Sequence, residues 1–258
     1  MQEWIRKSLH GRHLQDLCHS NVDNKASNEW LRRGELFPET EGFLMAIQDQ
    51  VIETRNYQRY IMKLPNLQTD NCRRCNSSSE TIQHITGACK AIVQTDYKYR
   101  HDQVANIIHQ SIAQKYKLLE HPPITYYKYS PETILTDRTV HYNRPDITLV
   151  DKINKTAIII DIAIPNTHNL QKTIAEKLSK YLELKEEITR MWKLNKVTMV
   201  PIVLSTTGVI PLQLASSLRS LDLPDYTYAA LQKATILNTC RIVRKFLQAS
   251  QDSSQTHA

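Results

Sequence analysis

The sequence predicts an α/β fold preceded by a helical segment and a small cysteine and histidine cluster. Residues 144–165 read as two β-rich runs around a polar turn, which is the pattern of a β-hairpin. Residues 169–195 carry apolar side chains at helical spacing, and residues 196–206 are β-rich again. Strand-rich segments on either side of a helix are typical of a sheet with helices packed on it.

The N-terminal part of the chain reads as helical and charged. Its best predicted helix runs from Glu41 to Met62, and Pro65-Asn66 ends it. We therefore divide the chain by composition and pattern. The predicted parts are a helical linker over 1–68, the cluster over 69–92, the main domain over 93–249 and a polar, disordered tail over 250–258.

Four side chains at the spacing of zinc ligands form the cluster: Cys72-x2-Cys75-x8-His84-x4-Cys89. Thiolates and an imidazole in this pattern suit a closed, tetrahedral Zn²⁺ site. A redox-active Cys-x2-Cys pair is the alternative, but no thioredoxin-like strand precedes it. Arg73, Arg74 and Lys90 make the segment basic, which suits a phosphate-facing module. So short a segment holds no apolar core, so we expect it to need its metal to fold and to lie outside the main domain.

Two aspartates occupy matching places in the predicted hairpin. If the turn is symmetric about Ile153-Asn154, Asp146 faces Asp161 directly across the strands, with Cβ atoms roughly 5 Å apart. Two carboxylates at that distance repel unless one is protonated or a cation lies between them, and Mg²⁺ is a hard cation that favours oxygen ligands. The alternative is that both acids lie on the solvent face of an ordinary hairpin.

Alternation along the strands predicts which residues share a face with the aspartates. The aspartate face carries Thr148, Val150, Ile159 and Ala163. The opposite, aliphatic face carries Ile147, Leu149, Ile158, Ile160 and Ile162.

The helix after the hairpin brings two lysines toward the aspartates. Its predicted apolar stripe consists of Leu170, Ile174, Leu178, Tyr181, Leu182, Ile188 and Trp192. At 100° per residue, Lys177 lies about 60° from the centre of the stripe and Lys180 about 120° away. Lys177 can therefore lean along the sheet toward the carboxylates, whereas Lys180 points toward water. A solvated helix face is the alternative for either lysine.

A strand with Pro-Asp, a second acid and a helix with a lysine together resemble the restriction-like nuclease family, PD-(D/E)xK. The family's usual lysine position, two residues after the second acid, holds Ala163 here. A lysine on the following helix resembles the variant in restriction-like endonucleases of non-LTR retrotransposons. The matching residues are Arg144-Pro145-Asp146, Asp161 and Lys177-Leu178-Ser179-Lys180-Tyr181.

Two further segments resemble the same retrotransposon proteins. Arg100-His101-Asp102 opens an amphipathic helical run over 97–119 and resembles the Arg-His-Asn/Asp start of that nuclease. Residues 40–57 resemble the linker between polymerase and zinc knuckle in insect elements. The resemblance extends from about Leu9 to Leu247. It implies a PD-(D/E)xK nuclease core over 93–249, a mixed sheet flanked by helices, preceded by a helical linker and a CCHC zinc knuckle.

This resemblance implies a Mg²⁺-dependent DNA endonuclease, part of a reverse transcriptase and endonuclease polyprotein, that nicks target DNA for target-primed reverse transcription. Asp146 and Asp161 would hold Mg²⁺, Lys177 would position the water or neutralise the phosphate with Lys180 as the second candidate, and Zn²⁺ would be structural. DNA and element RNA are the implied partners, and the nucleus is the implied compartment. The candidate nucleic-acid contacts are Arg73, Arg74, Arg100, His101 and Arg144. The sequence contains no Phe/Tyr-x-Asp-Asp polymerase signature.

Composition narrows the class of protein. A net charge of +7 suits a polyanionic partner, and 41% hydrophobic residues suffice for a packed core. The chain lacks both a run of eighteen apolar residues and an N-terminal signal-like stretch, which argues against membrane insertion and secretion. Cys18 and Cys240 stand apart from the cluster, which fits a reducing compartment. Two other classes stay open: a non-catalytic nucleic-acid-binding module derived from such an element, and a structural zinc protein with an acidic surface hairpin.

Overall fold

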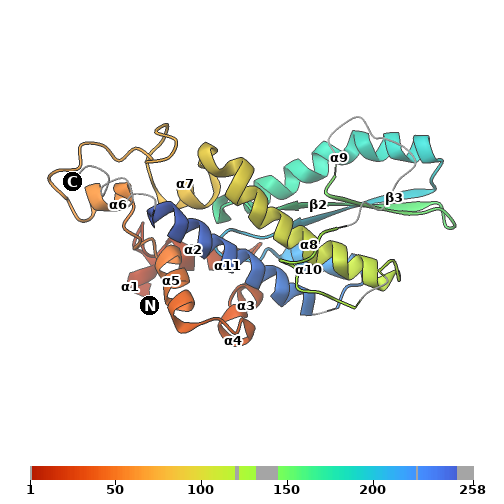
Figure 1. Cartoon of the computed structure of the whole chain (residues 1–258), viewed down its shortest axis with the longest axis horizontal. Helices are drawn as coiled ribbons and strands as arrows, with labels where there is room; N and C mark the ends of the chain where they lie inside the picture. Colours follow the sequence, from red (N-terminus) through yellow and green to blue (C-terminus); the bar gives the residue numbers. More distant parts are fainter. Residues whose placement is uncertain (1, 120–121, 132–144, 225, 249–258) are drawn as a thin grey trace.

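The computed structural model describes residues 2–119, 122–131, 145–224 and 226–248 (Figure 1). Helices make up most of the part before the sheet, and three strands follow. The helices before the sheet are α1 Gln2–Ile5, α2 Arg12–Leu17, α3 Asn24–Ser27, α4 Trp30–Arg33, α5 Pro38–Gln48, α6 Arg55–Tyr60, α7 Ile82–Gly87 and α8 Lys98–Lys115. The remaining elements are β1 Ile147–Asp151, β2 Thr156–Ala163, α9 Leu170–Trp192, β3 Lys196–Val203, α10 Leu212–Ser220 and α11 Tyr226–Gln248.

The three strands form one mixed sheet in the order β1-β2-β3. The hairpin β1–β2 is antiparallel, and Ile147 pairs with Ile160, which is the register that the symmetric turn predicts. After β2 the chain crosses through α9 and returns as β3, parallel to β2. A helix is the usual crossover between parallel strands, so the predicted order of strand, helix and strand accounts for this topology.

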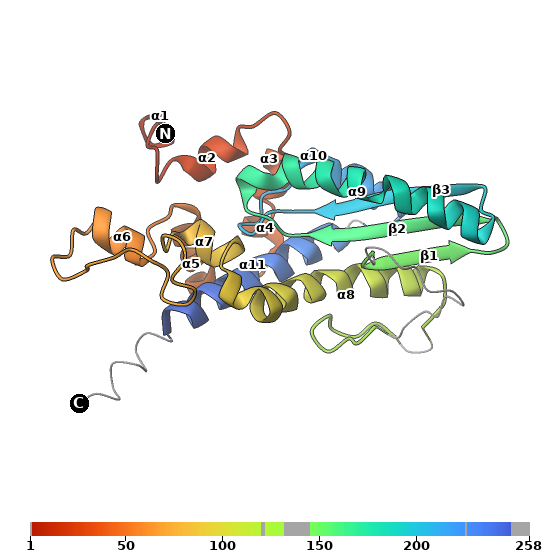
Figure 2. The same ribbon diagram turned by 90° about the horizontal axis from the view of Figure 1, so that it is seen from above.

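Helices cover both faces of the sheet, which Figure 1 shows nearly edge-on and Figure 2 nearly face-on. On one face, α9 packs Tyr181, Leu184 and Ile188 against Ile159 and Val197. On the other, α8 packs against the aliphatic face of the hairpin and α10 packs against β3, and the strand residues in this cluster are Ile147, Ile160, Ile162, Val200 and Ile202. The packing confirms the predicted aliphatic face and places Ile159 and Asp161 on the opposite, α9 face. Asp146 lies before β1, outside the ladder.

The α9 stripe differs from the prediction at two positions. Leu170, Ile174, Tyr181 and Ile188 are buried as expected. Leu178 and Leu182, however, are 41% and 61% exposed. These two leucines line a groove together with Val197 and Met199 of β3, which is an edge strand of the sheet in the described residues.

The predicted helix from Glu41 to Met62 is wrong as a single element, because two shorter helices replace it. The helix α5 ends at Gln48, and Gln50 takes a left-handed backbone conformation with φ 58°. Thr54 then caps α6 by accepting a hydrogen bond from the Tyr57 amide. The break lets Ile52 turn into the core.

The cluster segment does not stand apart from the rest of the protein, contrary to our expectation. Ile82, Ile85 and Ile92 belong to a buried apolar cluster that also holds residues of α5 and α11. The helix α11 supplies Ile236, Cys240, Ile242, Val243 and Phe246 to it. The segment therefore has an apolar core, which distant parts of the chain provide.

Asn166 links the cluster segment to the loops that follow β2 and β3. Its Nδ2 donates to the Gln83 carbonyl over 2.9 Å, and its Oδ1 accepts from the hydroxyls of Thr86 and Thr206 over 3.1 and 3.3 Å. A Cβ on Gly87 would lie 2.8 Å from this Oδ1, so only glycine fits there without displacement. The contact holds α7 beside the carboxyl ends of β2 and β3.

Candidate functional site

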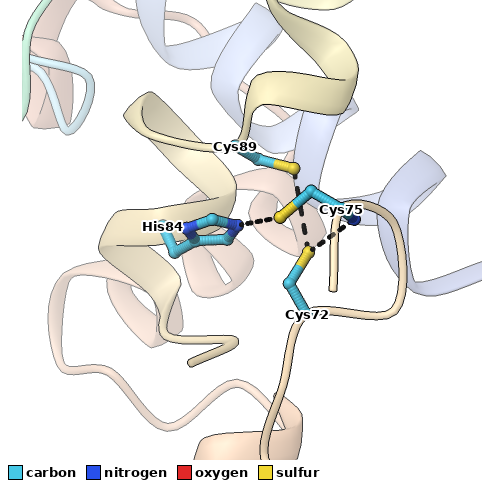
Figure 3. Close-up of side chains that lie close together, drawn as sticks. All are labelled: Cys72, Cys75, His84 and Cys89. Atoms are coloured by element: carbon cyan, nitrogen blue, oxygen red, sulfur yellow. Dashed lines mark hydrogen bonds between the residues drawn. The ribbon is translucent and has the colours of Figure 1, made fainter. Parts of the chain in front are cut away.

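Two separate groups of side chains carry chemistry. The first is the cysteine and histidine cluster, in which one donor atom from each of Cys72, Cys75, His84 and Cys89 lies within 4.8 Å of the others (Figure 3). The Cys72 and Cys89 sulfurs are 3.7 Å apart, and Cys75 Sγ lies 3.3 Å from His84 Nε2. A tetrahedral ion with Zn–S bonds of about 2.3 Å places two sulfurs about 3.8 Å apart. The cluster could therefore hold a zinc ion.

Local structure brings the four ligands together. The Cys72–Cys75 turn directs the amides of Arg74 and Cys75 at Cys72 Sγ over 3.4 and 3.5 Å. Thr81 caps α7 through the His84 amide, which fixes the start of the helix that carries this imidazole. Amide hydrogen bonds to sulfur stabilise the thiolate that a metal requires.

The cysteine thiols differ in acidity. Although burial opposes ionisation of Cys75, hydrogen bonds from Ser77, Cys72 and His84 outweigh it and lower the pKa of Cys75 to about 6. Burial, together with the neighbouring Cys72, raises the pKa of Cys89 to about 12. A bound cation favours the thiolate at each position, so metal binding would release protons.

The two arginines in the cluster segment have different surroundings. Arg73 forms an ion pair with Glu80, which is fully buried, and the guanidinium donates two hydrogen bonds of 2.9 and 2.6 Å to it. Glu80 also accepts from the Arg55 amide. The ion pair of Arg73 with Glu80 therefore stabilises the loop that carries Cys72 and Cys75. Arg74, by contrast, is exposed and its guanidinium lies 5.8 Å from the centre of the Phe246 ring.

The second group surrounds the two aspartates at one end of the hairpin. The β1–β2 ladder ends at the Ile147–Ile160 pair, so Asp146 comes just before this pair on one chain segment and Asp161 just after it on the other. The Asp146 carboxylate accepts the Ile162 amide over 2.6 Å, so it continues the ladder where β1 has ended. Asp161 is buried on the α9 face and accepts the Tyr181 hydroxyl over 2.7 Å.

A basic side chain pairs with each of the two carboxylates. Lys177 on α9 forms an ion pair with Asp161, and the Lys177 side chain is 22% exposed. His101 on α8 lies between two acids, with Nε2 3.1 Å from Asp146 and Nδ1 3.2 Å from Asp102. Each carboxylate therefore has a basic partner from the protein itself, Lys177 for Asp161 and His101 for Asp146.

The acidities of these groups follow from those contacts. Burial favours the neutral Asp146, but the His101 and Ile162 hydrogen bonds and the charge of Lys177 outweigh it and lower the pKa of Asp146. Burial favours the neutral His101, but Asp146 and Asp102 raise the pKa of His101. Burial and the adjacent Asp161 raise the pKa of Tyr181, so its hydroxyl stays a donor.

The predicted difference between the two lysines agrees with their positions. Lys177 reaches Asp161, as expected for a lysine at the edge of the packed stripe. Lys180 is exposed, and its Nζ lies 5.0 Å from the centre of the Tyr181 ring. Lys180 has no ion pair with either aspartate in the described residues.

Two predicted nucleic-acid contacts take other positions, and a third lies outside the described residues. Arg100 is 2% exposed and donates to Thr239, and burial lowers the pKa of Arg100 to about 10. A guanidinium at that depth cannot reach a phosphate, so the expected contact is wrong for Arg100. His101 lies beside Asp146 instead, which sequence reasoning missed because 45 residues separate them. Arg144 lies outside the described residues, as does the tail predicted to be disordered.

No family model matches the chain, and no curated protein is found to be similar to it. Within the described ranges, the cysteine and histidine cluster is the one group of three or more such ligands close enough to share an ion. The helices of the described residues include none with the length and apolar character needed to cross a membrane.

Proposed function

We propose that the chain is a Mg²⁺-dependent DNA endonuclease of the restriction-like PD-(D/E)xK type. The observations that carry the proposal are the ion pair between Lys177 of the crossover helix and Asp161, and the hydrogen bond from the amide of the next residue, Ile162, to the Asp146 carboxylate. Two acids from neighbouring strands and a nearby lysine are the groups that metal-assisted phosphodiester hydrolysis needs.

In this proposal the aspartates supply the oxygen ligands. Asp146 and Asp161 would hold Mg²⁺ through their carboxylate oxygens. Bound there, the ion would activate a water and stabilise charge on the phosphate. His101 and Tyr181 orient the two carboxylates by hydrogen bonds of 3.1 and 2.7 Å, as outer-shell partners do in metal sites.

Lys177 is the proposed catalytic lysine. Its ammonium lies against Asp161 and can turn to the attacking water or the scissile phosphate when Asp161 binds a cation. Lys180 is the second candidate. It rests against the Tyr181 ring and would have to leave it to reach the carboxylates.

The cluster is proposed to hold structural Zn²⁺ and to face nucleic acid with Arg74. Resemblance to non-LTR retrotransposon proteins supports target DNA as the substrate, with nicking that primes reverse transcription in the nucleus and with element RNA as a second ligand. The resemblance rests on Pro145-Asp146, Asp161, the Lys177–Tyr181 segment and the Cys/His spacing.

Nicking of supercoiled plasmid DNA with and without Mg²⁺ tests the proposal. We expect Mg²⁺-dependent nicking by the parent protein and none by Asp146→Ala or Asp161→Asn. Lys172→Ala is the matched control, because Lys172 is an exposed lysine in the first turns of the same helix. Absence of nicking by folded, zinc-loaded parent protein over a range of DNA sequences contradicts the proposal.

A non-catalytic nucleic-acid-binding module is the second candidate function. The observation that favours it is the Lys177–Asp161 ion pair itself, because a buried carboxylate that already has a cationic partner needs no metal. This candidate predicts salt-dependent DNA binding without cleavage.

A further inference from the structure

The last strand of the sheet has an open edge along its first half. The Ser217 hydroxyl donates to the Pro201 carbonyl over 2.7 Å, so the Pro201 backbone points away from β2. The Leu204 amide, by contrast, donates to Ala163 at the end of β2. Because backbone groups alternate along a strand, Val197 and Met199 also point their N–H and C=O groups away from β2.

Pro201 and α10 close the second half of this edge, but nothing closes the first half in the described residues. Pro201 has no N–H to offer, and Ser217 takes its carbonyl, so a strand cannot be added there. No described residue pairs with the outward backbone groups of Val197 and Met199. An edge of this kind is a template for another strand.

The open half lies at the base of a groove between α9 and β3. The groove has a volume of about 710 Å³, and Leu178 and Leu182 form its helical wall. With Leu178 at 41% and Leu182 at 61% exposed, the wall presents apolar surface. Side chains of an added strand that point to the α9 face would cover both leucines.

The positive charges of the residues that line the groove favour an acidic segment as the added strand. Lys185 and Lys196 line the groove, and its described lining residues include no acid. A second copy of this chain would bring its own lysines to the same place, whereas an acidic segment would pair with them. We propose that the α9–β3 groove binds an extended segment of a partner protein as a fourth strand, with apolar side chains at alternate positions and acidic residues beside Lys185 and Lys196. This proposal does not depend on the nuclease proposal.

A fluorescein-labelled peptide with the sequence Ser-Val-Thr-Val-Thr-Val-Asp-Asp tests this assignment by fluorescence anisotropy on the whole protein. We expect saturable binding that falls at least tenfold in Leu182→Glu, and similarly when proline replaces the central valine of the peptide, because proline removes a ladder donor. Leu212→Glu is the matched protein variant, because Leu212 is an exposed leucine on α10, outside the groove. It should bind the peptide as the parent does. Thermal unfolding of both variants verifies that they are folded.

Hydrogen exchange on the same samples locates the contact. Bound peptide should slow exchange of the Val197 and Met199 amides. Failure of the peptide to bind, equal binding by the proline peptide, or undiminished binding to Leu182→Glu overturns the proposal. A dimer of the protein alone that Leu182→Glu dissociates, measured by sedimentation, also overturns it, because the occupant is then a second copy.

Discussion

Removal of the Lys177 ammonium should destabilise the protein as well as stop nicking. In Lys177→Ala, the Asp161 carboxylate, 4% exposed, keeps the Tyr181 hydrogen bond but loses its cation. Loss of one partner from a buried ion pair costs about 3–5 kcal/mol. Because Lys177 is 22% exposed and water can enter in its place, we expect a loss of about 3 kcal/mol in the free energy of unfolding.

Matched variants separate the free energy contributed by the ion pair from the free energy lost with the packing of the lysine side chain. Asp161→Asn keeps the acceptor for Tyr181 and leaves Lys177 free to turn to water, so it should cost about 1 kcal/mol. The double variant has no unpaired buried charge and should lose about 1.5 kcal/mol in all, which implies a coupling of about 2.5 kcal/mol. Lys180→Ala should change stability by less than about 0.5 kcal/mol.

Urea unfolding of the parent, the two single variants, the double variant and Lys180→Ala measures these differences. Losses that add within about 0.5 kcal/mol refute the ion-pair argument. In parallel nicking assays Lys177→Ala should be inactive with DNA affinity nearly unchanged, since one phosphate contact is a small part of binding. Lys180→Ala should lose less activity, and parental activity in Lys177→Ala overturns our assignment of the catalytic lysine.

Three further predictions concern other parts of the molecule. Purified protein should contain about one Zn²⁺ per chain by elemental analysis. Chelation of the metal or Cys75→Ser should lower the melting temperature of the whole protein, because the cluster packs against α11. Purified protein without zinc, or a melting temperature that chelation leaves unchanged, contradicts this. Gly87→Ala should cost about 1–2 kcal/mol in urea unfolding, because its Cβ meets Asn166, and the double variant with Asn166→Ala should not show that added cost. His101→Asn should reduce stability more at about pH 5.5 than at about pH 8.5. Because the folded protein raises the pKa of His101, the stabilisation from protonated His101 is present below the pKa of the unfolded chain and is lost as pH rises. Because the pKa of Asp146 is lowered, its stabilisation is lost only at acid pH, so the pair stabilises the protein most at pH values between the pKa of Asp146 and that of His101. An equal loss of stability at both pH values refutes this.

Local pattern was sufficient for several parts of the fold. The alternation in residues 147–163 and the polar turn fixed the hairpin register, because a slip of one residue would move the aliphatic side chains of one strand to the aspartate face. The helical period predicted α8 and α9. Ligand spacing alone identified the cysteine and histidine cluster, because the ligands come from one turn, one short helix and the residues just after that helix.

Tertiary contacts decided the rest. Arg73 and Arg100 read as surface cations, but Glu80 binds the first and α11 buries the second. The approach of His101 to Asp146 depends on how α8 packs on the sheet. The sequence by itself determined the elements and the ligands that are close along the chain, since short-range periodicity and spacing encode them. Only the folded structure decided which charges are buried, which acid meets which base and where the sheet stays open, because those outcomes depend on packing between segments far apart in sequence.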